Sequence, residues 1–121
     1  MLTKAYDYKE LIVWQKADEL AIEIYKISKH FPKDELYGLT SQIRRAALSI
    51  PTNIVEGYAR KGDKELARFA NIAIGSLAET EYLLDFSKRL GCLDEKEYTR
   101  IEYLRSEVGK LLWNFYKKVA C

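Results

Sequence analysis

Hydrophobic residues recur along the chain at every third or fourth position, the spacing that places them on one face of an α-helix. Four segments show this pattern, at residues 8–31, 35–59, 63–90 and 94–119. No segment alternates hydrophobic and polar residues over a useful length, so no β-strand is predicted. The turns are short, which favours antiparallel neighbours. The sequence therefore predicts an all-α fold, an antiparallel up-down-up-down four-helix bundle, in a single domain spanning residues 1–121.

The hydrophobic stripes define a predicted core. The stripe of the second segment begins at Leu36, and that of the fourth includes Leu111. We expect these side chains to be almost inaccessible to solvent: Leu20, Ile24, Ile43, Ile50, Leu77, Val108 and Leu111.

Several residues mark the expected ends of the helices. Asp63 is a plausible N-cap of the third helix, and Gly91 is expected just beyond its C-terminus. Asp94, followed three residues later by Glu97, resembles a capping box at the start of the fourth helix.

The second segment departs from an ordinary bundle helix. Pro51 lies inside it, at a cost of about 3 kcal/mol, which indicates either a packed kink or a bend that shapes a surface. Its hydrophobic arc is also wide, because Leu48, Val55 and Tyr58 lie beside the main stripe. A helix buried over so much of its circumference indicates a second partner, and we expect Leu48 and Val55 near contacts between subunits.

The remaining arc of this segment carries a polar row. Its members follow spacings of three or four residues and share one face: Gln42, Arg45, Ser49, Asn53, Glu56 and Arg60. Such mixed donors and acceptors suit a subunit contact or the backbone of a polynucleotide. A solvated face is the simpler interpretation of the same pattern.

Charge is nearly balanced over the chain, with 20 Lys and Arg, 18 Asp and Glu, and a net charge of +2. That value is too small to indicate nucleic-acid binding, but residues 41–68 hold six basic and three acidic side chains. The candidate nucleic-acid site consists of Arg44, Arg45, Arg60, Lys61 and Arg68. Glu56 precedes Arg60 by four residues, the favourable spacing for a helical ion pair, so Arg60 is the first that an acid would neutralise.

Candidate catalytic chemistry is absent from the sequence. One histidine and two separate cysteines cannot form a zinc site of the usual spacing, and no phosphate-binding glycine loop or catalytic triad is recognisable. We therefore expect a protein that is not an enzyme and needs no cofactor or metal. Two unpaired thiols and the lack of any run of about 20 apolar residues predict a cytoplasmic protein without membrane contact.

Three blocks of sequence carry a family resemblance. YGLTSQIRRAALSIPTNIVEG (residues 37–57) resembles the signature of a bacterial four-helix-bundle family named after 23S rRNA intervening sequences. LIVWQKADEL (residues 11–20) and ELARFANIAIGSLAETEYLL (residues 65–84) are similar to the first and third helices of that family. The similarity weakens in the fourth helix.

The resemblance implies a homopentameric ring encoded within an insertion in a ribosomal RNA gene. It also implies kinship with the accessory proteins of diversity-generating retroelements, basic pentameric barrels that bind nucleic acid and partner a reverse transcriptase. The positions that match the family are Arg44, Arg45, Ser49, Asn53, Glu56, Gly57, Arg68 and Phe69. The chain departs from the family pattern at Val55 and at Gly62-Asp63, and it is much less basic than the retroelement branch.

Two hypotheses follow for function. In the first, a non-catalytic homo-oligomer binds RNA or DNA through the basic residues around the second segment. In the second, the protein is a scaffold or adaptor for a protein partner, without a nucleic-acid ligand. Strong weakening of polynucleotide binding by salt would favour the first, and neutralisation of the basic patch by neighbouring acids would favour the second.

Overall fold

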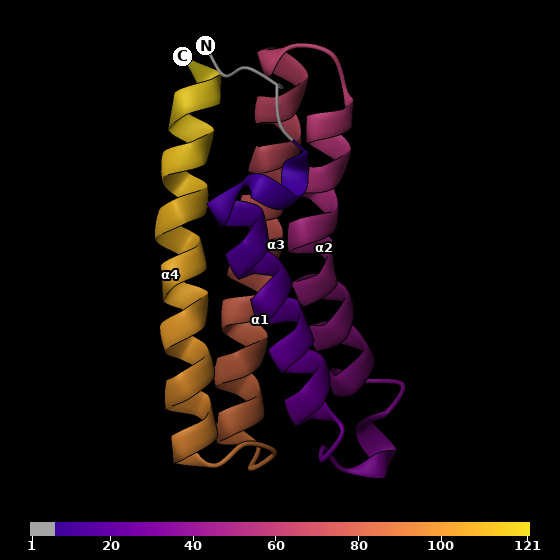
Figure 1. Ribbon diagram of the computed structural model, residues 1–121. Coiled ribbons are helices and arrows are strands. Elements are labelled where there is room, and N and C mark those ends of the chain that lie inside the picture. Colours follow the sequence, from indigo (N-terminus) through magenta and orange to yellow (C-terminus); the bar gives the residue numbers. More distant parts are fainter. Residues whose placement is uncertain (1–6) are drawn as a thin grey trace.

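The computed structural model describes residues 7–121 and shows an all-α protein (Figure 1). Residues 1–6, which belong to the predicted domain, lie outside the described part. The helices are η1 (Tyr8–Glu10), α1 (Ile12–Ser28), η2 (Lys33–Glu35), α2 (Leu39–Ala59), α3 (Asp63–Arg89) and α4 (Glu95–Ala120), where η denotes a short 3-10 helix. Successive long helices run in opposite directions, so the predicted four-helix bundle is confirmed (Figure 1).

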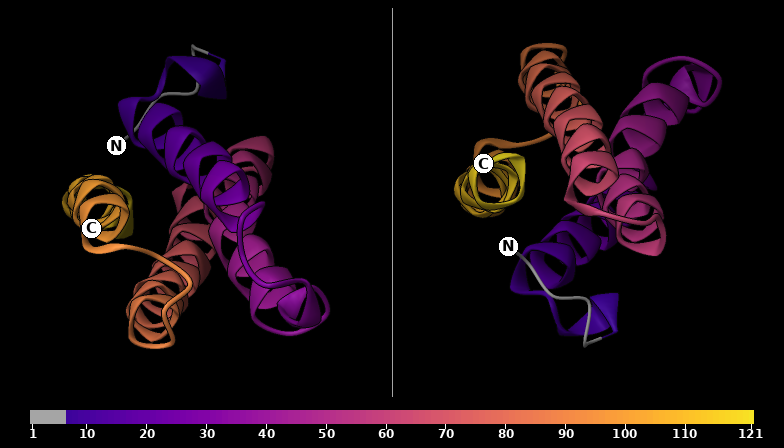
Figure 2. Two further views of the ribbon diagram at one scale, coloured as in Figure 1. Left: turned by 90° about the horizontal axis from the view of Figure 1, so that it is seen from below. Right: turned by 90° about the horizontal axis from the view of Figure 1, so that it is seen from above.

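The four long helices do not lie strictly parallel. Viewed along the bundle, α2 and α3 cross and then diverge towards the end that carries η2 and the α3–α4 turn (Figure 2). At the opposite end their termini lie side by side and are joined by the short α2–α3 turn (Figures 1 and 2). The diverging ends leave open grooves between α2 and α3, which are described below.

The core lies where the four stripes meet, and six of the seven predicted core residues are buried. Leu20, Ile24, Ile43, Ile50 and Val108 have no exposed surface, and Leu77 is 6% exposed.

The seventh prediction, Leu111, is wrong. Leu112 occupies the core position, and Leu111 is only partly buried at the edge of the core. Both residues continue the helical spacing after Val108, by three and by four residues, so periodicity alone does not distinguish them.

Two helices are shorter than predicted. α1 begins at Ile12, because Tyr8–Glu10 forms a separate 3-10 turn before it, and it ends at Ser28. α2 begins at Leu39, and Leu36 is an exposed residue of the preceding loop. The reason is a cap from the loop, since the Glu35 carboxylate accepts a hydrogen bond of 3.2 Å from the backbone N–H of Leu39.

The helix-end predictions have mixed outcomes. Asp94 caps α4 as expected, accepting a 2.7 Å hydrogen bond from the N–H of Glu97. Gly91 follows α3 with a φ of +89°, which glycine adopts without strain. Asp63 is not the N-cap of α3 but its first residue. Gly62 occupies the cap position with a φ of +85°, a conformation that disfavours Asp there.

Candidate nucleic-acid interface

The five predicted basic residues fall into two groups on α2 and its flanks. Arg44 and Arg45 lie near the start of α2, whereas Arg60, Lys61 and Arg68 surround the α2–α3 turn at the other end. A helix rises 1.5 Å per residue, so the two groups are roughly 20 Å apart. A single chain therefore presents three of the five side chains together and not all of them.

Arg44 is bound to α1 of the same chain. Its Nε donates a 2.7 Å hydrogen bond to the hydroxyl of Ser28, and its Nη2 donates a longer one, 3.4 Å, to the carbonyl of Tyr25. The guanidinium also lies 4.9 Å from the centre of the Tyr25 ring. A cation at the C-terminus of α1 is favoured by the helix dipole, and it adds a donor to the Tyr25 carbonyl, which also accepts a 3.2 Å hydrogen bond from the Ser28 hydroxyl. We therefore assign Arg44 to joining α2 and α1.

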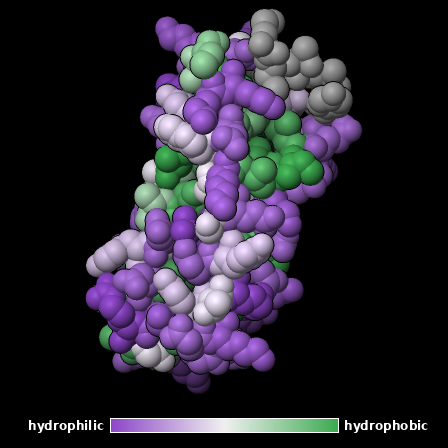
Figure 3. Space-filling model, turned by 90° about the vertical axis from the view of Figure 1, so that its left-hand side faces the viewer, coloured by the Kyte–Doolittle hydropathy of each residue, from purple (hydrophilic) through white to green (hydrophobic). Residues whose placement is uncertain are grey.

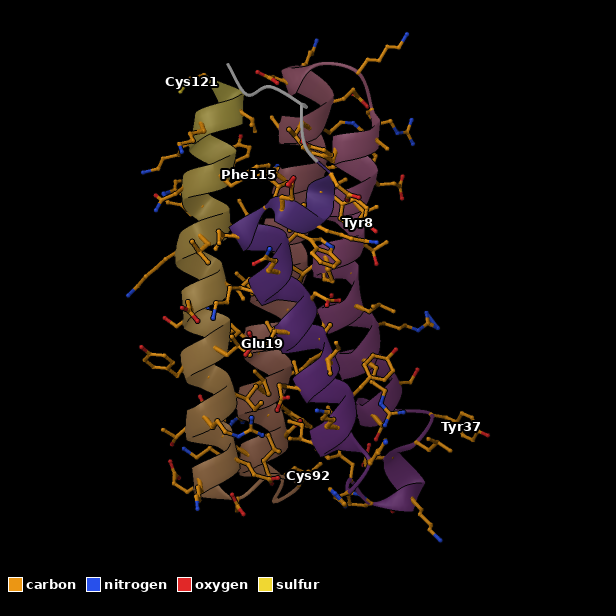
Figure 4. The ribbon with its side chains drawn as sticks, in the orientation of Figure 1. Tyr8, Glu19, Tyr37, Cys92, Phe115 and Cys121 are labelled. Carbon is orange, nitrogen blue, oxygen red and sulfur yellow. The ribbon has the colours of Figure 1, made fainter. Side chains whose placement is uncertain are left out.

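Arg45 points away from α1 and is exposed. It lines a shallow pocket of about 490 Å³ with Tyr37, Gln42 and Glu79, and it makes no hydrogen bond or ion pair within residues 7–121. Tyr37 is 94% exposed and projects away from the bundle (Figure 4).

Arg60 and Arg68 converge on one aromatic ring. Their guanidinium carbons lie 5.2 Å and 4.4 Å from the centre of the ring of Phe69, a buried residue of α3. Cation–π contacts of this kind hold a guanidinium over a ring without removing it from solvent. Lys61, in the turn between them, is exposed and has no ion pair among the described residues.

Acidic neighbours partly neutralise this group. Arg60 pairs with Glu56 at 3.3 Å, as the sequence spacing suggested, and Arg68 pairs with Glu65 at 3.3 Å. The hydrogen bond from Arg68 lowers the pKa of Glu65 below its ordinary value, and the charges of Arg68, Arg60 and Lys64 act in the same direction. The arginine side chains remain 51% and 55% exposed, and solvent screens ion pairs that are so exposed. A competing anion can therefore displace these carboxylates at little cost.

The polar row on α2 is partly occupied by hydrogen bonds within the chain. Asn53 donates through Nδ2 to the carbonyl of Ser49 at 2.8 Å and to its hydroxyl at 2.9 Å. The Ser49 hydroxyl lies 2.8 Å from that of Ser76 on α3. The middle of the row therefore joins α2 to α3, a use that the sequence did not reveal. Its ends, Gln42 and Arg60, are exposed.

The described residues contain no evident metal centre. No group of three or more His, Cys, Asp or Glu side chains within residues 7–121 is placed to hold a metal ion. Burial raises the pKa of the Cys92 thiol, which opposes the thiolate form needed of a nucleophile. In the same part of the chain, no helix is long and apolar enough to cross a membrane.

The fold and these positions agree with one protein family. The family of 23S rRNA-intervening sequence proteins matches residues 9–114. The chain belongs to this family. A crystal structure of a protein of unknown function from the S23 ribosomal protein family of Bacteroides thetaiotaomicron is similar, with 28% identity and a TM-score of 0.81. The match covers 88% of this chain and 99% of that chain. No curated protein matches significantly.

Contacts in the structure explain several of the positions that match the family. Arg44 joins α2 to α1, Ser49 joins α2 to α3, and Asn53 holds the Ser49 hydroxyl from within α2, so their place in the signature needs no ligand. Neither the name of the family nor the description of the Bacteroides protein mentions a catalytic activity.

Sequence reasoning missed a second group of exposed side chains, on α4. Trp113 is 51% exposed and stacks on Tyr116, with Lys117 beside it. A signal was present, because residues 108–121 contain three lysines and no acidic residue. It lies in the helix where the family resemblance weakens.

Proposed function

We propose that this 23S rRNA-intervening sequence protein is a non-catalytic homo-oligomer, a ring of five subunits, that binds RNA or another polynucleotide. The contacts come from Arg60, Lys61 and Arg68 at the α2–α3 turn, with Arg45 as an outlying contact. Arg44 leaves the proposed set because it is engaged with α1. The proposal also places the gene within an insertion in a ribosomal RNA gene and makes the retroelement accessory proteins relatives of this protein.

One observation carries the proposal, the convergence of two guanidinium groups on Phe69 beside the unpaired Lys61. Guanidinium groups are well suited to phosphate because they donate hydrogen bonds in a planar fork. Their present partners are exposed carboxylates, which hold them weakly. In a five-subunit ring the same cluster recurs five times, and weak contacts multiplied in this way give avidity without any strong single site.

An apolar surface between α1 and α2 supports assembly. A groove of about 340 Å³ is lined by Ala21, Ile22, Tyr25 and Leu48 together with polar neighbours. Leu48 is 47% exposed, and Ile22 is similarly exposed beside it. Exposed apolar side chains gathered in one groove are typical of a subunit contact. Val55, the other predicted contact residue, is half-buried on the same helix.

The alternative is a scaffold or adaptor that binds a protein partner. The ion pairs of Glu56 and Glu65 favour it, because they neutralise two of the three clustered basic groups. A groove of about 440 Å³ between the diverging ends of α2 and α3 also favours it, since Tyr82, Phe86 and Leu90 give it an apolar wall. A protein partner would use this groove rather than the α2–α3 turn.

A charge-removal variant distinguishes the two. Arg60, Lys61 and Arg68 are replaced together by Gln, and the protein is titrated against single-stranded RNA at two salt concentrations. Loss of three phosphate contacts should weaken binding and reduce the slope of log affinity against log salt by about 2. The control replaces Lys29, Lys33 and Lys96 at the other end of the bundle, which are exposed and have no ion pair among the described residues. Equal binding and slope in both variants, with the oligomer intact, would favour the scaffold.

A further inference from the structure

The second half of α4 carries an aromatic and basic outer face. Trp113 stacks on Tyr116 with ring centres 5.8 Å apart and planes inclined by 25°. Lys110, Trp113 and Lys117 follow spacings of three and four residues and share this face, away from the core positions Leu112 and Phe115. The Nζ of Lys117 lies 5.8 Å from the centre of the indole ring.

This face is free of acidic groups on its own helix. Residues 108–121 contain Lys110, Lys117 and Lys118 and no Asp or Glu, and none of the three lysines has an ion pair among the described residues. The preceding acid on α4, Glu107, is engaged by Lys16 of α1 at 3.6 Å.

The neighbouring half of α3 adds little negative charge. Residues 64–78 of α3 contain one acidic side chain, Glu65, which is paired with Arg68, and the first residue of the helix is Asp63. α4 ends at the same end of the bundle as the α2–α3 turn (Figure 1). Figure 3 shows the side formed by α4, where hydrophobic side chains gather in the upper half among hydrophilic ones. Unlike Arg60 and Arg68, the lysines of this face form no ion pair with a carboxylate of residues 7–121.

We propose that this face, defined by Lys110, Trp113, Tyr116 and Lys117, binds single-stranded polynucleotide by stacking an unpaired base on the Trp113 indole while the lysines contact the adjacent phosphates. The proposal rests on the polynucleotide binding put forward above and adds a second surface and a strand preference. An exposed indole flanked by lysines fits a single strand because only unpaired bases present their faces to a ring. A duplex would offer phosphates alone, to which the indole contributes nothing.

Fluorescence of Trp113 tests the stacking directly. The chain has two tryptophans, and the Nε1 of Trp14 has no hydrogen-bond partner among the described residues, so Trp14→Phe removes the second fluorophore without losing a hydrogen bond. In that background, oligouridylate should quench the remaining emission, whereas duplex RNA of equal phosphate concentration should not. Binding measured in parallel by anisotropy of labelled oligouridylate should weaken roughly 5- to 100-fold in Trp113→Ala. Trp113→Phe should recover part of that loss.

The control is Tyr103→Ala, which removes an exposed aromatic from the same helix next to Glu102 rather than among lysines. Its affinity should change less than twofold. A loss as large as that of Trp113→Ala, or no quenching and an unchanged Trp113→Ala affinity, would overturn the stacking site while leaving polynucleotide binding at the α2–α3 turn intact. Absence of any anisotropy change with wild-type protein would remove both proposals. A smaller oligomer mass for Trp113→Ala would instead make this face a contact with a second copy of the chain, which also overturns the proposal.

Discussion

Gly57 of α2 and Phe69 of α3 lie so close together that a Cβ atom on Gly57 would be 2.7 Å from the Cβ of Phe69. Real Cβ atoms do not approach each other so closely, so the two helices pack here at a separation that only glycine permits. The contact holds the Phe69 ring beneath Arg60 and Arg68. Gly57 and Phe69, which both match the family, thus form a single helix–helix contact. This contact holds the proposed phosphate-binding arginines in place.

Gly57→Ala should therefore destabilise the fold. Alanine favours a helix by up to about 1 kcal/mol over glycine, but overpacking against Phe69 and Leu66 should cost about 1–3 kcal/mol and outweigh it. The matched control is Gly75→Ala on α3, where a Cβ would meet no atom within 4 Å. That change should raise the free energy of unfolding by about 0.5–1 kcal/mol. Urea denaturation of both variants measures the difference, and stabilisation by Gly57→Ala would contradict the close approach.

Leu112 and Leu111 should respond differently to the same truncation. Leu112→Ala should lower the free energy of unfolding by about 2–5 kcal/mol, because it opens a cavity in a fully buried site. Leu111→Ala should cost clearly less, since that side chain keeps part of its surface in water. Denaturation curves of the two variants, measured side by side, provide the comparison. A larger cost for Leu111→Ala would mean that Leu111, the residue expected from the sequence, faces the core in place of Leu112.

The helices were predictable because buried residues recur with the helical period. The errors lie where a single contact, which leaves no periodic pattern in the sequence, decides where a helix starts or which residue is buried. Leu36 fits the hydrophobic stripe of α2, yet the helix starts at Leu39 because the Glu35 side chain caps it from the loop. Leu111 and Leu112 both fit the stripe of α4, and only packing against the other helices selects between them.

The candidate site was less predictable, because the partners of its charges are distant in sequence. Arg44 bonds to Ser28, 16 residues away on another helix, which no local pattern indicates. By contrast, the pair of Arg60 and Glu56 lies one helical turn apart, and the spacing predicted it.

An ion pair between α1 and α4 should make stability depend on pH. Arg100 donates a 2.6 Å hydrogen bond to Glu23, and this bond is the main cause that lowers the pKa of Glu23 below its ordinary value of 4.5. The stabilisation is therefore present above about pH 4.5 and lost as pH falls through the lower pKa of the folded state. Because Arg100 is half exposed, we expect only about 0.5–1 kcal/mol.

Glu23→Gln should lower stability at pH 7 by that amount, and the effect should shrink as pH falls through the lowered pKa of the folded state and the carboxyl group becomes protonated in both states. Thermal unfolding monitored by circular dichroism in a series from pH 7 downwards measures it. Glu10→Gln is the control, because Glu10 is exposed and has no ion pair among the described residues. If the two variants have the same pH dependence, the Arg100 contact contributes nothing in solution.

Leu48 should be needed for assembly. Replacing it by Glu would place a charge in the apolar groove beside Ile22 and Tyr25, and desolvating that charge would oppose a subunit contact. Light scattering should then report a smaller particle for the variant than for the wild-type protein. Leu36→Glu is the matched control, since Leu36 and Leu48 are both 47% exposed but Leu36 lies in the loop before α2. A monomeric wild-type protein at micromolar concentration would remove the assembly proposal, and equal effects of the two variants would remove the role of this groove.

Arg44 and Arg45 are adjacent in the sequence, yet their replacement should affect different properties. Arg44→Gln removes a charged hydrogen-bond donor from Ser28 and a cation from the Tyr25 ring, so the free energy of unfolding should fall by about 1–2 kcal/mol. Polynucleotide affinity and its salt dependence should not change, provided that both are measured where the variant is folded. Arg45→Gln should leave stability within about 0.5 kcal/mol, because this side chain is exposed and has no partner among the described residues.

Polynucleotide binding should depend on Arg45 and not on Arg44. As an outlying phosphate contact, Arg45 should account for about 0.7 of the slope of log affinity against log salt for a single strand, and Arg45→Gln should lose that increment. Anisotropy titrations against single-stranded RNA at several salt concentrations, paired with urea denaturation of the same samples, separate the two effects. If Arg44→Gln weakens binding while its stability is unchanged, then Arg44 leaves α1 to contact phosphate. The division of the two arginines into one that holds helices and one that meets the ligand would then be wrong.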